Sequence, residues 1–216
     1  MSAQTQVYDR MRALKVIPVV AIDEVDAALP LADALISGGL PVAEITFRTE
    51  AAAEVLRLLA AERPELLLGA GTVLNVTDLK RAKDCGARFA VSPGFNSDVA
   101  KAAQDLGLPF APGVMTPTDV EAALSLGLKT LKYFPAEAAG GLAFLKSLSA
   151  PYKHLGIQFI PTGGINAQNV AAYLGLETVL AVGGTWVAKR DMVASGRWDE
   201  IVDNCRHIRN LLSAST

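Results

Sequence analysis

Eight short apolar runs divide the chain at nearly even intervals, and they limit its fold more than any other feature. Each run is bounded by glycine or proline and is followed by a segment with the apolar spacing of an amphipathic helix. Continuous apolar runs of this kind are typical of parallel strands that are buried on both faces. The repeat therefore predicts strands that alternate with crossover helices. The runs are residues 16–22, 42–46, 66–69, 89–92, 109–111, 130–133, 159–162 and 179–182.

Eight strand and helix units predict an α/β fold, a closed (β/α)8 TIM barrel. An extra helix is expected over residues 5–14, before the first strand, and a last helix over residues 198–212. Several helices are expected to end at glycines, which favour helix ends. The main alternative is a doubly wound open sheet, which shares the alternation, but no GxGxxG follows the first strand. The glycines at the predicted helix ends are Gly38, Gly86, Gly107 and Gly127.

Length and composition favour one domain over residues 1–216. A chain of 216 residues with 51% hydrophobic side chains can bury a large core, and single α/β barrels commonly have this length. The net charge is -2 with acidic and basic residues mixed, so no basic stripe suits nucleic acid or an anionic membrane. The first apolar run is short and contains Pro18, so neither a secretory signal nor a membrane span is expected. These features predict a cytoplasmic protein.

Several kinds of catalytic site find little support. Cys85 and Cys205 form no CxxC motif and have no histidine at ligand spacing, so two reduced structural thiols are expected. His154 and His207 are expected at the surface. No HxH, HExxH or acidic cluster occurs at a strand end, so we predict a reaction that uses no metal and no cofactor.

Lys132 is a lone cation within the apolar run TLKYFP. An apolar site disfavours the charged form of an amine, so a neutral amine able to attack a carbonyl becomes available there. That is the chemistry of Schiff-base formation. The alternative is a surface lysine at a strand end whose ammonium group reaches water.

The run that contains EITFRT places a carboxylate, Glu44, inside an apolar segment, with Arg48 four residues later. In a barrel, the carboxyl ends of the strands build the active site, so Glu44 and Lys132 are expected to meet. Glu44 is predicted to shuttle protons, and the alternative is a structural ion pair. The planar guanidinium of Arg48 suits bidentate binding of a substrate carboxylate, and the alternative is a solvated loop arginine.

Small residues follow the third, fourth and fifth strands. Thr72 adds a hydroxyl after the glycines of GAGT, and Pro93 lies in SPG. Glycine lets the backbone approach a ligand closely, although glycines that only make tight turns are the alternative. After the seventh strand, Pro161 and Thr162 are expected to frame a substrate channel.

Two glycine pairs follow the seventh and eighth runs, in TGGIN and VGGTW. Barrels commonly bind phosphate after these two strands, where backbone N–H groups and a helix start face the anion. We therefore predict a phosphate site, in which a side chain at Gly164 or Gly184 would occupy the space of the phosphate. Turn formation alone is the alternative. The predicted phosphate-binding residues are Gly163, Gly164, Gly183, Gly184 and Thr185.

Six motifs, in their order and spacing, resemble the class I aldolases of the family that acts on 2-keto-3-deoxy-6-phosphogluconate (KDPG) and 4-hydroxy-2-oxoglutarate (KHG). The resemblance extends from Leu14 to the C-terminus, and EITFRT and LKYFPAE are its most specific motifs. It implies a (β/α)8 barrel, commonly a homotrimer, in a sugar-acid pathway of the Entner–Doudoroff type. The motifs are EITFRT, GAGTV, SPG, LKYFPAE, PTGGIN and VGGTW.

The resemblance also implies roles for single residues. Lys132 would form the Schiff base with the C2 carbonyl of the substrate, and Glu44 would be the acid/base. Arg48 and Thr72 would hold the pyruvate carboxylate, and Phe134 would pack against the substrate. The glycine pairs and Thr185 would bind the phosphate. Thr185 departs mildly from the family, where many members have serine, but its hydroxyl is retained.

Two other functions stay open from the sequence. A barrel isomerase or synthase could bind a phosphorylated sugar and use Lys132 and Glu44 for proton transfer without a covalent imine. A non-catalytic sugar-phosphate binding protein is the third, although an ion pair in an apolar site is costly without a use.

Overall fold

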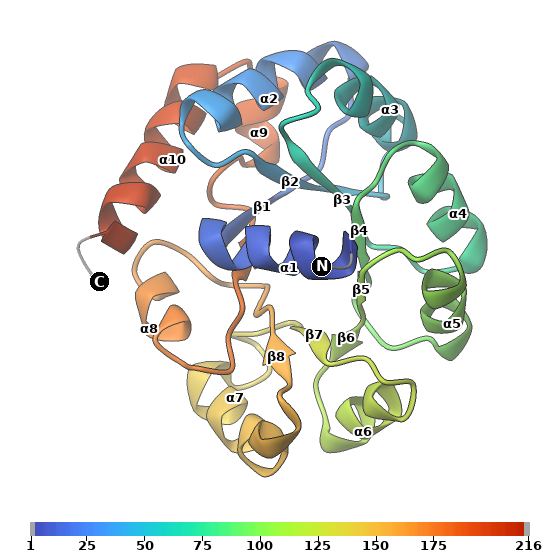
Figure 1. Cartoon of the computed structure of the whole chain (residues 1–216). Helices are drawn as coiled ribbons and strands as arrows, with labels where there is room; N and C mark the ends of the chain where they lie inside the picture. The colour runs from blue at the N-terminus through green and yellow to red at the C-terminus, as the bar shows by residue number, and fades with distance from the viewer. Residues whose placement is uncertain (1–2, 214–216) are drawn as a thin grey trace.

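The computed structural model describes residues 3–213, which form an α/β fold with most of the helices arranged in a ring outside the strands (Figure 1). The strands are β1 (Val16–Val20), β2 (Val42–Thr46), β3 (Leu67–Gly71), β4 (Phe89–Val91), β5 (Phe110–Ala111), β6 (Gly113–Val114), β7 (Thr130–Tyr133), β8 (Gln158–Phe159) and β9 (Val182–Gly184). The α-helices are α1 (Ala3–Leu14), α2 (Ala28–Ser37), α3 (Ala52–Glu62), α4 (Val76–Asp84), α5 (Ser97–Asp105), α6 (Pro117–Ser125), α7 (Gly141–Ser149), α8 (Val170–Leu174), α9 (Arg190–Ala194) and α10 (Trp198–Ser213). Two 3-10 helices, η1 (Val25–Ala27) and η2 (Ala150–Leu155), complete the elements.

The strands form two parallel sheets. Six strands pair in the order β5-β4-β3-β2-β1-β9, and three pair in the order β6-β7-β8. Two isolated parallel bridges, Phe159 with Val179 and Thr162 with Gly183, join the β8 segment to the β9 segment. Pro112 separates β5 from β6, because proline has no N–H to donate to a ladder. The alternation of parallel strands and helices predicted from the apolar runs is confirmed.

The glycine-containing strands differ from the prediction. The third run was expected to end at Gly69, but β3 continues to Gly71, and β9 contains Gly183 and Gly184. Gly71, Gly183 and Gly184 therefore lie within strands, beyond the predicted ends of the runs, whereas Gly69 lies within a strand as predicted. A glycine inside a strand commonly marks a close approach of another group. At Gly69 that group is the ring of Phe89, which would lie 2.1 Å from a Cβ atom.

The predicted ends of the outer helices are confirmed. Gly86, Gly107 and Gly127 follow α4, α5 and α6 in the left-handed conformation, with φ of 96°, 59° and 73°. Glycine adopts this conformation without the steric cost that other residues have. Gly38 ends α2 with a negative φ, and the left-handed residue there is Gly39. None of the helices within residues 3–213 is both long and apolar enough to cross a bilayer.

The strands lie between two hydrophobic clusters, one on their outer face beneath the helices and one on their inner face. The larger cluster packs the helices against the outer face of the strands, as with Ala43 and Ile45 of β2. The smaller cluster holds inward side chains such as Ile17 and Val42, and Val7 and Met11 of α1 pack on it. In Figure 1, α1 lies across the middle of the strands. The predicted N-terminal helix therefore covers the inner core at the amino ends of the strands and leaves the carboxyl ends for a site.

Candidate active site

A cavity of about 170 Å³ lies at the carboxyl ends of the strands. It brings together the predicted site residues except Pro161 and Gly183, which do not line it. Its wall is formed by residues of β1, β2, β7 and β9 and by the segments that follow β2, β3, β4, β7, β8 and β9. The lining residues are Val19, Glu44, Thr46, Arg48, Thr72, Pro93, Lys132, Phe134, Thr162, Gly163, Gly164, Ile165, Gly184 and Thr185.

Lys132 and Glu44 form an ion pair in the wall of this cavity. Lys132 Nζ lies 3.0 Å from Glu44 Oε1, and the two side chains are 7% and 4% exposed. The strands that carry them, β7 and β2, are not paired with each other, so the contact crosses the interior. The ring centroid of Phe134 lies 5.6 Å from Lys132 Nζ. Lys132 is therefore not a surface lysine, and it is a buried amine beside a single carboxylate.

Arg48 and Thr72 lie on the wall of the same cavity. Arg48 is exposed, and among residues 3–213 no carboxylate forms an ion pair with it. Thr72 directly follows β3 and has a φ of 59°, which is unusual for a residue with a β-branched side chain. Residues held in such conformations cluster at ligand sites. A guanidinium without a protein partner and a constrained hydroxyl are thus available to a ligand.

The missing side chains of the glycine pairs make room for protein and not for a ligand. A Cβ atom on Gly164 would lie 2.6 Å from Glu137, and one on Gly184 would lie 1.7 Å from the ring of Trp186. The expectation that a side chain at either glycine would take the place of a phosphate is therefore wrong. Gly163 and Gly164 also have φ of 99° and 82°, which explains the glycines in this turn by conformation.

The residues beside these glycines that line the cavity lie in turns, and not at a helix end. Within the described part of the chain, the N–H groups of Gly164, Ile165 and Thr185 donate to no protein acceptor. The expected helix starts are absent from this position, because α8 begins only at Val170 and α9 only at Arg190. Turn amides with free hydrogen-bonding capacity can bind an anion directly.

Gly183 does not line the cavity. Its N–H donates to the carbonyl of Pro161 at 2.9 Å, so this amide already has an acceptor. A Cβ atom on Gly183 would lie 2.4 Å from Thr162 Oγ1. Gly183 therefore allows Thr162 to pack against β9, and it brings no group of its own to the cavity.

The segment after Lys132 is bonded to the glycine turn after β8. The N–H groups of Ala136 and Glu137 donate to the carbonyls of Thr162 and Gly163 at 2.8 Å and 3.0 Å. The hydroxyl of Tyr173 donates to the Glu137 carboxylate, and burial together with this bond raises the pKa of Tyr173. These hydrogen bonds hold the segment that follows Lys132 against the glycine turn that follows β8.

Sequence reasoning missed Val19, Thr46 and Ile165 in the cavity wall and Glu137 behind it. Thr46 could have been found, because residues two apart on a strand share a face and Glu44 was already expected to point inward. Its buried hydroxyl donates to the carbonyl of Val20 at 3.2 Å. Glu137 lies in the LKYFPAE motif, but no local signal places it beside Gly164.

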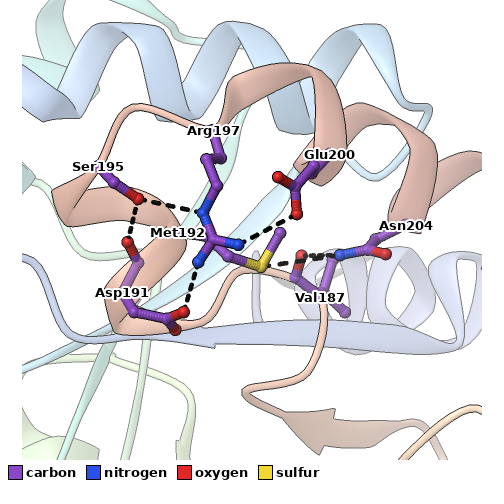
Figure 2. Close-up of polar contacts among 7 residues, drawn as sticks. All are labelled: Val187, Asp191, Met192, Ser195, Arg197, Glu200 and Asn204. Carbon is purple, nitrogen blue, oxygen red and sulfur yellow. Dashed lines mark hydrogen bonds and ion pairs between the residues drawn. The ribbon is translucent and has the colours of Figure 1, made fainter.

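A polar cluster supports the segment that follows β9. Figure 2 shows Arg197 between Asp191 and Glu200, with Ser195 on the same guanidinium. Asn204 of α10 donates to the carbonyl of Val187 at 3.1 Å. These contacts join α9 and α10 to the chain that leaves Thr185, so they anchor this part of the cavity wall from outside.

The remaining reactive side chains lie away from the cavity. Cys85 and Cys205 are buried as free thiols, and burial raises the pKa of Cys205 to about 12. His154 and His207 are exposed, as predicted. Among residues 3–213, no group of three His, Cys, Asp or Glu residues is placed to hold a metal ion.

Similar proteins carry the same fold and closely related sequences. The 2-dehydro-3-deoxy-phosphogluconate aldolase of Haemophilus influenzae is 45% identical over 96% of this chain and 97% of its own. The KHG/KDPG aldolase of Escherichia coli K12 is 40% identical over 88% of this chain and 89% of its own. A crystal structure of KDPG aldolase from Legionella pneumophila, with pyruvate captured as a covalent carbinolamine intermediate, has a TM-score of 0.90. It is 39% identical, and the match covers 95% of this chain and 98% of that one.

The family model for KDPG and KHG aldolases matches residues 7–204. This range contains the whole cavity wall, including Lys132 and Glu44. The resemblance of the six motifs is therefore confirmed over most of the chain. This chain belongs to the KDPG and KHG aldolase family.

Proposed function

We propose that the protein is a class I aldolase that cleaves KDPG to pyruvate and glyceraldehyde 3-phosphate. It also cleaves 4-hydroxy-2-oxoglutarate to pyruvate and glyoxylate. The observation that carries this proposal is the buried contact of 3.0 Å between Lys132 Nζ and Glu44 Oε1 in the cavity wall. Related proteins named for both activities support it.

In this mechanism, the amine of Lys132 attacks the C2 carbonyl of the substrate and forms a carbinolamine. Loss of water gives a protonated imine, which accepts the electron pair of the C3–C4 bond as that bond breaks. The proton of the C4 hydroxyl leaves at the same step, so glyceraldehyde 3-phosphate departs as an aldehyde. Lys132 then holds an enamine, which takes a proton at C3. Hydrolysis of the resulting imine releases pyruvate and the free amine.

Glu44 transfers the protons in these steps. Its carboxylate contacts Lys132 Nζ directly, so it is close to the nitrogen and oxygen atoms that change protonation. It donates a proton to the leaving hydroxyl of the carbinolamine and accepts protons when the aldehyde departs. A bridging water can extend its reach to the C4 hydroxyl.

Arg48 and Thr72 bind the carboxylate of the pyruvyl portion. The guanidinium of Arg48 has no carboxylate partner in the described chain, and its planar fork matches a carboxylate. Phe134 packs against the substrate beside Lys132, while Pro93 and Thr162 shape the cavity wall.

The phosphate of KDPG binds at the other part of the cavity wall. The free amides of Gly164, Ile165 and Thr185, together with the Thr185 hydroxyl, supply donors without a charged side chain. Gly163 and Gly184 shape the backbone around these donors.

We also propose an organisation for the protein, from its strand pairing and its family resemblance. The two sheets together close into an eight-stranded (β/α)8 barrel, in which β5 and β6 act as one interrupted strand, and residues 1–216 form one domain. The bridges from the β8 segment to Val179 and Gly183 support closure. The protein is a homotrimer in the cytoplasm, where phosphorylated sugar acids are retained. Light scattering that gives a mass other than three chains would contradict the trimer.

The purified protein should release pyruvate from both KDPG and 4-hydroxy-2-oxoglutarate without added cofactor. A continuous assay coupled to reduction of pyruvate measures both rates. Equal protein concentrations of a Lys132 variant provide the blank for contaminating aldolase. Binding of KDPG without pyruvate release would contradict the aldolase and favour a binding protein.

Replacement of Thr185 by valine should weaken the use of KDPG about 10-fold in kcat/KM, because it removes one donor to the phosphate. The shape of the side chain is nearly unchanged, and the free amide at this position is retained. The reaction of 4-hydroxy-2-oxoglutarate, which lacks a phosphate, should change by less than about twofold. Parallel assays of the two substrates with one preparation make the comparison internal. Equal losses for both substrates would show that Thr185 does not bind phosphate.

A further inference from the structure

Gly71 lies directly against the carboxylate of Glu44. It is the last residue of β3, paired in register with Thr46 of the neighbouring strand β2. A Cβ atom on Gly71 would lie 2.2 Å from Glu44 Oε1 and 2.8 Å from its Cγ. Both distances are shorter than any non-bonded contact with a carbon atom permits. A side chain as small as that of alanine would therefore force the carboxylate to move.

The backbone gives no other reason for a glycine at this position. Gly71 is not among the residues with a positive φ, and Ala70 precedes it in the same strand. Glycine within a strand costs conformational entropy relative to alanine. What the glycine provides is space on the inner face of β3, and the carboxylate of Glu44 occupies that space.

The position of this space matters for the contact with Lys132. Glu44 and Lys132 lie on strands that are not paired, so the glutamate side chain has to cross the interior of the molecule. The oxygen that would collide with a Cβ on Gly71 is Oε1, which is also the atom 3.0 Å from Lys132 Nζ. We propose that Gly71 is a positioning residue, whose missing side chain seats the Glu44 carboxylate against the amine.

A double-mutant cycle tests this proposal with Gly71→Ala, Glu44→Ala and the double variant. In the wild-type background, Gly71→Ala should lower the melting temperature by about 3–10 °C, as expected for an overpacked interior. In the Glu44→Ala background, the same change should not lower it, because the added methyl group enters the space that the carboxylate left. The melting curves measure this coupling without any assay of activity.

Gly69→Ala is the matched control. It lies on the same inner face of β3, but its Cβ would meet the ring of Phe89 and not Glu44. Its effect on melting should be the same in the wild-type background and in the Glu44→Ala background. An equal loss from Gly71→Ala in both backgrounds would overturn the proposal. If Gly71→Ala alone does not fold, recovery of folding in the double variant supports the positioning role of Gly71, and failure to recover contradicts that role.

The catalytic consequence rests on the proposed function. Gly71→Ala should lower kcat for KDPG about 100-fold, the scale of a displaced acid/base group, with a much smaller change in KM. Glu44→Asp withdraws the carboxylate by one methylene, so adding Gly71→Ala to Glu44→Asp should cost less than about threefold. A further 100-fold loss of kcat when Gly71→Ala is added to Glu44→Asp would contradict the positioning role of Gly71. Coupling in the melting curves without aldolase activity in the wild type would reject the proposed function alone.

Discussion

Replacement of Lys132 by methionine should abolish aldolase turnover, with a loss of at least about 10⁴-fold in kcat, the scale seen when a covalent nucleophile is removed. No other amine lines the cavity among residues 3–213, so none can form the imine in its place. Methionine fills a similar volume, and Glu44 can take up a proton and become neutral, so the fold should be retained. Circular dichroism and a melting curve check the fold of the variant.

Borohydride trapping assigns the reaction to this amine. Incubation of the wild-type protein with pyruvate and borohydride should add one reduced adduct, and peptide mapping should place it on Lys132. Lys132→Met should give no adduct. Lys153→Met is the control, because Lys153 is 51% exposed and pairs with Glu177 outside the cavity. Turnover without an adduct, or an adduct at another lysine, would favour an isomerase or synthase that uses no imine.

Replacement of Glu44 by glutamine should lower kcat by about 100-fold or more, the usual scale for a group in general acid–base catalysis. Glutamine keeps the length of the side chain and can still accept a hydrogen bond from Lys132, but it cannot exchange a proton. The imine with pyruvate should still form, although more slowly, because its nucleophile is present. Single-turnover trapping with borohydride, followed over time, separates this slow imine formation from loss of the nucleophile.

Glu177→Gln is the matched control, because Glu177 belongs to an exposed ion pair and is 86% exposed. Its kcat should equal that of the wild type. If Glu44→Gln also keeps wild-type turnover, Glu44 is only the structural partner of Lys132. A buried ion pair alone is weak support for catalysis, because such pairs also occur where no reaction takes place.

Much of the site could be predicted because it depends on local patterns. Each apolar run indicates a buried strand. A charged residue within such a run has to point into a site or pair with another charge. The contact between Glu44 and Lys132 could be predicted in this way, and the structure confirms it. The alternation of inward and outward residues would also have found Thr46.

The roles of the glycines could not be predicted in the same way. Gly71 and Gly164 each make room for one side chain from a distant position in the sequence, whereas Gly184 makes room for Trp186, two residues later. The partner of Gly71 lies on the neighbouring strand, and the partner of Gly164 follows another strand. A glycine pair also fits a strand as well as a turn, which is why the prediction placed Gly183 and Gly184 after the strand that contains them.

The fit of Glu137 beside Gly164 and of Trp186 beside Gly184 has a consequence for redesign of the acceptor specificity. Single-site libraries at either glycine will mostly yield destabilised variants, because every new side chain meets an atom already in place. In paired libraries, a larger residue replaces Gly184 and a smaller one replaces Trp186, so the total volume of the two side chains stays constant. The Trp186 indole N–H has no acceptor in the described structure, so its removal leaves no hydrogen bond to replace. This pair is the more favourable starting point for an aldolase that takes up a different aldehyde.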